Sequence, residues 1–368
     1  MTTKLPTLGA TLLCAACAAV TPGAPRDELA LPPASPDAPS LPGPAPRRRT
    51  FDAAAVNARC ESCHAEVARE WRASLHAGAH RDPVYVSQFA HEPLPFCTGC
   101  HAPEADPTLP VPEPLSVLGV GCVTCHVVGD RILAAPDAAA DADGVPHALT
   151  RTADFAADSA CAACHEFAFP GQSGRAQPLL MQSTVSEHAA SPYAARSCAS
   201  CHMPEVAGSG RGARRSHAFS ASRDESFVRS AVVVEGARLE EGALTLTVRP
   251  GLVGHAFPTG DMLRRLALRL ELRDARGAVL ARQERFFQRR FGFRRAPNAP
   301  PERVLEADQR VGVGAGTLVA GGLATELPAG TRLHYALHYE RVADPGSYAG
   351  GAVVDGSILL AEGELTPP

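Results

Sequence analysis

The chain has 368 residues, which is enough for two domains that each bury a core of their own. Its formal net charge is -4 at pH 7, and this acidic balance gives no support to nucleic-acid binding. Aromatic residues make up only 5% of the chain, with a single tryptophan, so ordinary side chains are expected to leave part of the interior unfilled.

Residues 1–17 predict a secretory signal peptide with a possible lipoprotein cleavage site. One positive charge, at Lys4, precedes an apolar run over residues 5–19 that is too short to span a bilayer as a permanent helix. Cys17 follows small residues, as in bacterial lipoproteins, although such sites usually have leucine where this chain has Cys14. We expect an exported protein, in the periplasm or on the outer-membrane surface, with membrane contact through a lipid on Cys17. A signal that is simply cleaved is the alternative.

Residues 18–50 predict a proline-rich linker. Proline, alanine and serine dominate residues 21–46, and this stretch has no apolar periodicity. Such a segment is semi-extended, and it would hold a lipid-anchored domain away from a membrane surface.

Residues 51–225 contain the pattern Cys-x-x-Cys-His five times. The copies are Cys60, Cys63 and His64; Cys97, Cys100 and His101; Cys122, Cys125 and His126; Cys161, Cys164 and His165; and Cys198, Cys201 and His202. This spacing is the attachment signature of c-type haem, in which two thiols bind the haem covalently and the histidine ligates the iron. The region therefore predicts a haem-rich domain, mostly helix and loop, with five covalently attached haem c groups.

The remaining cysteines argue against other uses of this pattern. The chain has twelve cysteines, ten of them in the five motifs, and the other two lie at the extreme N-terminus. A structural zinc site needs a second ligand pair at a characteristic distance, without a histidine beside every pair. A thioredoxin-like redox motif would occur once and not five times.

The sequence around the motifs resembles the multihaem c-type cytochromes of the cytochrome c-554 group, over roughly residues 55–275. The shared features are Glu70-Trp71-x-x-Ser74-x-His76, Cys97-x-x-Cys100-His101-Ala102-Pro103, Gly119-Val120-Gly121-Cys122 and Cys198-x-x-Cys201-His202-Met203-Pro204. The resemblance implies electron transfer between periplasmic partners. It also implies that some relatives with an open haem act on nitrogen or sulfur compounds.

Each haem iron needs a second axial ligand, and histidine is the default in packed haem arrays. The expected ligands are His76, His147, His188, His217 and His255. His76 and His217 match positions of the resembled family, and His147 is the only histidine between the third and fourth motifs. The family often has tryptophan at the position of His188, and a histidine such as His255 could instead be hydrogen-bonded inside a tight turn. His91 is the reserve candidate, whereas His80 is favoured as a solvated histidine that does not bind iron. The sulfur atoms of Met181, Met203 and Met262 are alternative ligands, although methionine more often fills a core.

Residues 226–368 predict an all-β domain. Alternating apolar residues indicate strands at residues 231–237, 244–248, 266–272, 279–286, 333–339 and 357–360. This number of short strands favours an immunoglobulin-like β-sandwich. Eleven arginines between Arg264 and Arg295 could dock an acidic partner, but a solvated sheet face is the favoured interpretation.

These observations predict an exported multihaem cytochrome c that carries single electrons, with no catalytic residues. Its partners would be donor and acceptor cytochromes or a quinol-oxidising membrane complex, and not nucleic acid. Two alternatives remain open. One is an oxidoreductase with an open haem that acts on a small nitrogen or sulfur compound, and the other is a subunit of a conductive cytochrome filament.

Overall fold

A computed structural model describes residues 31, 40–45, 49–138, 147–172, 176–208, 212–240, 243–295, 297, 301–312, 317–320, 328–346 and 351–366. The predicted signal peptide, the lipidation site Cys17 and most of the predicted linker lie outside these residues. Within them, no helix is both long enough and apolar enough to cross a membrane.

The N-terminal part of the described chain is built from short helices. Five of them carry the motifs: α1 (Ala53–Cys63), α4 (Pro95–His101), α6 (Cys122–His126), α8 (Ser159–His165) and α10 (Cys198–His202). The others are α2 (Ala65–Arg72), α3 (Pro83–His91), α5 (Glu113–Leu118), α7 (Ala153–Ala156), α9 (Thr184–Ala189) and α11 (Glu225–Ser230). Short strands lie between them: β1 (Val127–Val128), β2 (Arg131–Ala134), β3 (Thr150–Arg151), β4 (Glu166–Ala168), β5 (Leu180–Ser183), β6 (Glu205–Ala207) and β7 (Ala213–Arg215).

Local capping explains where several of these helices begin. Asp52 accepts hydrogen bonds from the backbone N–H groups of Ala54 and Ala55 at the start of α1. Asp82 accepts from the N–H of Val84 at the start of α3, where Pro83 occupies the first turn. Helices this short are not stable through helix propensity alone, so tertiary packing must stabilise them.

Apolar side chains fill little of this helical part. Its buried cluster has five residues: Ala53, Trp71, Leu118, Val123 and Val127. The buried cluster of the C-terminal part has sixteen residues. We expected ordinary side chains to leave part of the interior unfilled, and this expectation applies to the helical part.

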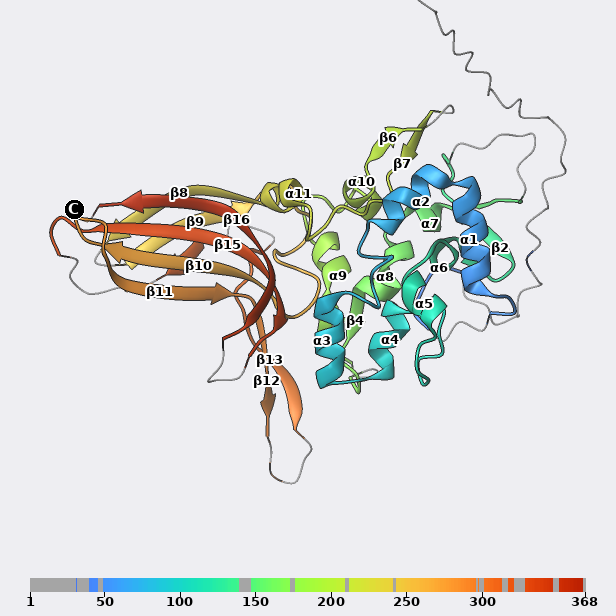
Figure 1. The fold of residues 1–368 in the computed structure, drawn as a ribbon, viewed down its shortest axis with the longest axis horizontal. Coiled ribbons are helices and arrows are strands. Elements are labelled where there is room, and N and C mark those ends of the chain that lie inside the picture. The colour runs from blue at the N-terminus through green and yellow to red at the C-terminus, as the bar shows by residue number, and fades with distance from the viewer. Residues whose placement is uncertain are drawn as a thin grey trace, which may run out of the picture.

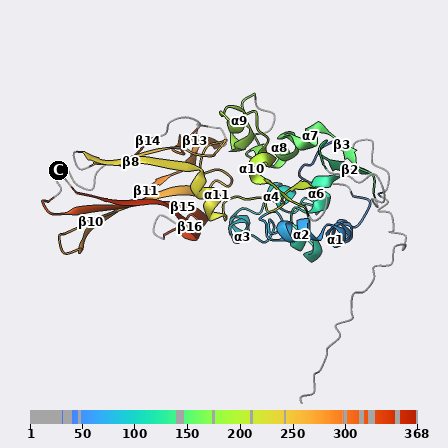
Figure 2. The same cartoon turned by 90° about the horizontal axis from the view of Figure 1, so that it is seen from above.

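The C-terminal part consists of antiparallel sheets. A four-stranded sheet has the order β11-β10-β15-β16, and a three-stranded sheet has the order β14-β9-β8. The strands are β8 (Val232–Glu240), β9 (Ala243–Pro250), β10 (Arg264–Arg273), β11 (Val279–Phe287), β14 (Thr317–Ala320), β15 (Arg332–Asp344) and β16 (Val353–Leu365). Figure 1 shows these sheets on one side of the molecule and the helices on the other, and Figure 2 shows the same division from above.

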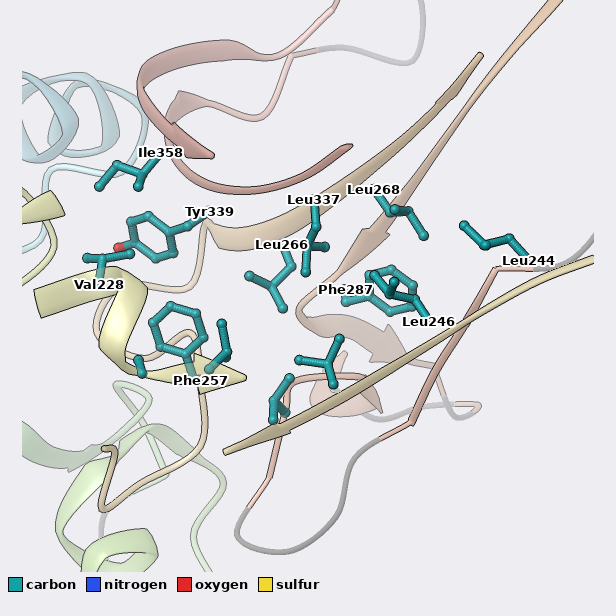
Figure 3. Close-up of a cluster of buried hydrophobic side chains, with 14 of the residues drawn as sticks. Val228, Leu244, Leu246, Phe257, Leu266, Leu268, Phe287, Leu337, Tyr339 and Ile358 are labelled. Carbon is teal, nitrogen blue, oxygen red and sulfur yellow. The ribbon is translucent and has the colours of Figure 1, made fainter. Parts of the chain in front are cut away.

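The two sheets share one core (Figure 3). Leu244 and Leu246 of β9 contribute to it from one sheet, and Leu266 and Leu268 of β10 from the other. Leu268 faces Leu337 in the register of β10 with β15. The predicted strands are therefore present, with longer bounds, while the immunoglobulin-like arrangement stays a prediction.

Most arginines of the arginine-rich stretch, residues 264–295, form ion pairs. Arg265 and Arg269 both bind Glu340, which is fully buried, and Arg273 and Arg282 both bind Glu271. A hairpin that the sequence did not predict, β12 (Arg289–Arg294) with β13 (Glu302–Asp308), projects beside the helical part in Figure 1. Arg273 and Arg282 fit the predicted solvated face, whereas the pair of Arg265 and Glu340 is buried.

Candidate haem-iron centres

Each motif occupies the end of a short helix, so its two cysteines lie one turn apart on the same face. In three motifs the histidine Nδ1 donates to a backbone carbonyl: His101 to Ala79 at 2.8 Å, His126 to Leu133 at 2.9 Å, and His202 to Ser220 at 2.7 Å. A carbonyl can only accept, so the hydrogen sits on Nδ1 and the lone pair on Nε2 is left for a metal. Thiols and imidazole are thus arranged as covalent haem attachment requires.

Four of the motif histidines face a second histidine. The ring centres are 6.3 Å apart for His64 and His147, 6.2 Å for His165 and His76, 6.2 Å for His126 and His217, and 6.3 Å for His202 and His255. An imidazole nitrogen binds a metal at about 2 Å and the ring centre lies roughly 1 Å behind it, so two histidines on opposite sides of one ion have ring centres about 6 Å apart. The four pairs therefore fit an iron between them.

Burial keeps the imidazoles of His76, His165 and His217 neutral. It lowers the pKa of His76 to about 3, and the pKa values of His165 and His217 to about 4, with neighbouring histidines adding to the effect. A neutral imidazole has the lone pair that a metal needs, so no proton has to be displaced near neutral pH.

His188 lies in a different setting from the other four expected ligands. Its Nδ1 is 3.0 Å from Asp158 Oδ2, and Oδ1 of the same carboxylate accepts from the backbone N–H of Cys198 at 2.7 Å. His188 is only 8% exposed, and Gly254 packs so closely that a Cβ there would lie 2.7 Å from its ring. Among the described residues, no ring pair joins His188 to a motif histidine.

His101, in the second motif, is the motif histidine without a histidine opposite it in the described part of the chain. The ring of Tyr85 stacks on its face at 3.9 Å between centres. Neither His80 nor His91 has a ring contact with a motif histidine among the described residues. His80 Nδ1 lies 3.0 Å from Ser116 Oγ, and His91 Nδ1 lies 2.7 Å from the carbonyl of Ser87. Met181 and Met262 line a small cavity, and Met203 caps α10.

The Glu-Trp-x-x-Ser-x-His stretch positions two of the paired histidines. Glu70 accepts two hydrogen bonds from Arg214, at 2.8 and 2.9 Å, and one from the backbone N–H of His217 at 2.8 Å. Trp71 donates its indole N–H to the carbonyl of Val120 at 2.8 Å. The stretch therefore connects α2 both to the segment of His217 and to the segment that leads into the third motif.

Gly119 completes this arrangement because no side chain fits there. Its φ is +57°, and a Cβ would lie 2.6 Å from the carbonyl oxygen of His76. The same carbonyl accepts a hydrogen bond from the N–H of Val120 at 2.9 Å. The glycine of the Gly-Val-Gly-Cys motif thus lets the chain approach the segment that carries His76.

Phe219 was not predicted to have a role, although it lies between two of the pairs. Its ring centre is 4.3 Å from that of His76 and 5.7 Å from that of His217. It is also the one described residue other than glycine with a positive φ, at 50°. Because nothing in the residue type signals a left-handed backbone, this position could not be found from sequence.

Neighbouring motifs are in contact through their thiols. Cys164 hydrogen-bonds to Cys100 and raises its pKa, which brings the second and fourth motifs together. Cys161 and Cys198 are similarly bonded, which joins the fourth motif to the fifth. Burial and the nearby thiol of Cys60 raise the pKa of Cys122 to about 12. The closeness of these two cysteines places the first motif beside the third.

A family of proteins and a solved structure are similar to this chain. Residues 59–127 match a family described as cytochrome c554 and c-prime. A solved structure, a penta-heme cytochrome c552 from Thermochromatium tepidum, is 20% identical with a TM-score of 0.60, and the match covers 84% of this chain and 97% of that one. At this identity the likeness shows a shared fold. No curated protein matches the chain significantly.

Proposed function

We propose that this chain is a multihaem c-type cytochrome of the cytochrome c-554 group that carries single electrons between redox partners. The family match over residues 59–127 and the shared fold support this proposal. The observation that supports this most is the set of four histidine pairs at the spacing of a doubly ligated iron. A doubly ligated haem has no open position for a substrate, so it suits electron transfer.

The proposal assigns five haem c groups, one to each motif, held through its two cysteines. The second ligands are His147 for the first motif, His217 for the third, His76 for the fourth and His255 for the fifth. When bound, each haem supplies a one-electron redox centre whose potential depends on its ligands, burial and nearby charge.

Contacts between neighbouring motifs support a continuous route. The first motif adjoins the third, the fourth adjoins both the second and the fifth, and Phe219 lies between His76 and His217 of the fourth and third sites. This order gives a line from the first site to the fifth, with the second site as a branch. Close packing of this kind is what transfer over several centres needs.

Location and partners are part of the proposal. The apolar N-terminus, the lipidation site Cys17 and the proline-rich linker over residues 18–50 suit an exported protein tethered to a membrane, in the periplasm or on the outer-membrane surface. Partners of such a carrier are donor and acceptor cytochromes or a quinol-oxidising membrane complex. The C-terminal sheets are proposed as an immunoglobulin-like domain spanning residues 226–368.

Two measurements on the mature protein test the carrier function. We expect its mass to exceed the polypeptide by five haems, and a redox titration to show five one-electron centres that reduce and reoxidise reversibly with a small mediator. A colourless protein, or one whose centres cannot be reoxidised, would refute the proposal.

A second function is favoured by one observation, the absence of a described histidine opposite His101. An open iron at the second motif would suit an oxidoreductase that acts on a small nitrogen or sulfur compound. The test is whether one haem in five gives a high-spin ferric signal and binds carbon monoxide. Five low-spin haems would exclude this function and leave electron transfer alone.

A further inference from the structure

His255 belongs to the sheet-rich part of the chain but faces an iron site in the helical part. Its ring lies 6.3 Å from that of His202 on α10, and the two planes are only 12° apart. Its Nδ1 donates to the carbonyl of Ala256 at 3.1 Å, which fixes the ring and leaves Nε2 for a metal. The position of this loop therefore decides whether the fifth site is complete.

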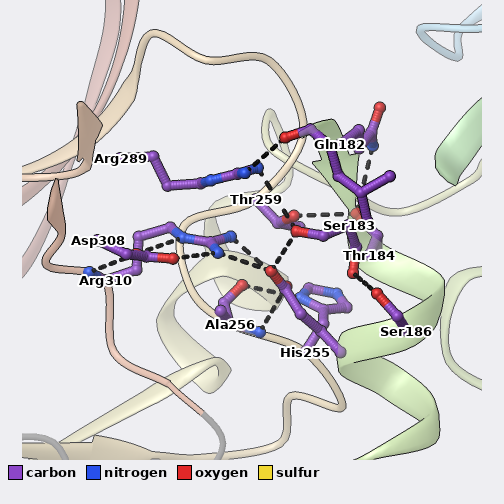
Figure 4. Close-up of polar contacts among 12 residues, drawn as sticks. Gln182, Ser183, Thr184, Ser186, His255, Ala256, Thr259, Arg289, Asp308 and Arg310 are labelled. Atoms are coloured by element: carbon purple, nitrogen blue, oxygen red, sulfur yellow. Dashed lines mark hydrogen bonds and ion pairs between the residues drawn. The ribbon is translucent and has the colours of Figure 1, made fainter. Parts of the chain in front are cut away.

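Glu187 on α9 holds that loop from the helical side. Its Oε2 accepts from the backbone N–H of Ala256 at 3.1 Å, immediately after His255. Figure 4 shows His255 and Ala256 of this loop together with Arg310 and Asp308. Its Oε1 accepts from Ser183 Oγ at 2.7 Å and from Arg310 at 2.6 Å. One carboxylate thus joins α9, the His255 loop and the sheet-rich part.

Arg310 is the buried cation of this network, with a side chain only 6% exposed. Besides Glu187 it binds Asp308 at 2.7 Å. Its neighbour Val311 exchanges two backbone hydrogen bonds with Phe257, at 2.7 and 2.8 Å, so the chain two residues after His255 is fixed by the same segment. The ion pair and the backbone bridge hold the loop together.

We propose that Glu187 and Arg310 are positioning residues that hold His255 at ligand distance from the iron of the fifth motif. This inference rests on the proposed haem-binding function. A ligand has to be held within a fraction of an ångström, and a buried pair that loses one partner leaves an uncompensated charge that moves to reach water. Without the pair, the His255 loop loses its anchor and the fifth iron loses its second ligand.

The test uses the matured holoprotein with Glu187→Met. We expect one haem more than in the wild type to become high-spin and to bind carbon monoxide, and added imidazole to restore the low-spin signal. Arg310→Met should give the same change, and Arg310→Lys, which keeps the charge, a smaller one. His255→Gly provides the reference spectrum of a fifth site without its ligand.

Glu302→Met is the matched control, because Glu302 pairs with Arg294 at 2.7 Å in the nearby hairpin, where the arginine side chain is 68% exposed. It should leave every haem in its wild-type spin state. A Glu187→Met protein that melts earlier but keeps the wild-type spin states would overturn the inference and leave the carrier function intact. A wild-type protein without haem would instead refute the carrier function.

Discussion

Phe219 stands edge-on to His76, with ring centres 4.3 Å apart and ring planes at 83°. The same ring meets His217 at 5.7 Å and 84°. Edge-to-face contacts of this kind stabilise aromatic pairs beyond the burial of their surface. They also explain why a bulky residue is held at a φ of 50°, a conformation that costs about 1–2 kcal/mol.

Replacing the Phe219 ring should therefore destabilise the sites of His76 and His217 together. We expect Phe219→Leu to destabilise the holoprotein by about 1–2 kcal/mol, because both edge contacts and part of the buried surface are lost. Thermal unfolding followed by visible haem absorbance measures the effect. Phe219→Tyr keeps the ring and serves as the control, and a leucine variant that melts with the tyrosine variant would contradict the role of the contacts.

Gly119→Ala tests the close approach beside His76. A Cβ there would lie 2.6 Å from the carbonyl oxygen of His76, whereas a Cβ on Gly171, which also has a positive φ, meets nothing within 4 Å. Both alanines pay the left-handed backbone penalty of about 1 kcal/mol, but only the first also clashes. We expect the Gly119→Ala variant to unfold at a lower temperature than the Gly171→Ala variant and to show one additional high-spin haem. Equal unfolding curves would count against this explanation.

Asp224 makes stability depend on pH at the junction between helices and sheets. It caps α11 by accepting from the N–H of Phe227 at 3.1 Å, and this bond lowers the pKa of its carboxyl group. A lowered folded-state pKa stabilises the protein above the unfolded value of about 3.9, and this stabilisation is lost as the pH falls through the folded-state value.

The matching experiment compares Asp224→Ala with the wild type across pH. The alanine variant should be less stable by about 1 kcal/mol at pH 7, and the difference should shrink below about pH 4. Asp224→Asn, which can still cap the helix, should recover much of the loss without the pH dependence. A difference that stays constant from pH 7 to pH 3 would show that the carboxylate charge is not involved.

Glu340 is the buried anion of the four-stranded sheet. It is fully buried and binds Arg265 at 2.8 Å as well as Arg269. Glu340→Ala should cost about 3–5 kcal/mol, because it leaves the buried Arg265 without its carboxylate, while the more exposed Arg269 keeps Glu284. Glu364→Ala, which breaks an exposed pair with Arg332, should cost less than about 1 kcal/mol. Chemical denaturation monitored by far-ultraviolet circular dichroism distinguishes the two, and similar losses would contradict the assignment.

Much of the helical part followed from local spacing. The motifs predicted a part built from helices and loops, as the structure shows, and four of the five histidines expected as second ligands lie opposite a motif histidine at about the spacing of one metal. Their role as ligands stays a prediction. The family resemblance is confirmed by the match over residues 59–127.

What could not be predicted depends on residues far apart in sequence. Nothing near His188 indicates that Asp158 lies 3.0 Å from its ring. The hairpin of β12 and β13 was missed because its arginines hide the alternation that marks a strand. The left-handed backbone of Phe219 and the partners of Glu187 likewise follow from packing and not from local pattern.

The histidine pairs interleave along the chain. His64 faces His147, His76 faces His165, His126 faces His217, and His202 faces His255. A break between any two successive motifs, or between the last motif and the sheets, therefore separates the members of at least one pair. The helical part cannot be divided into single-haem modules, and no truncation between motifs yields two fragments whose pairs are all intact.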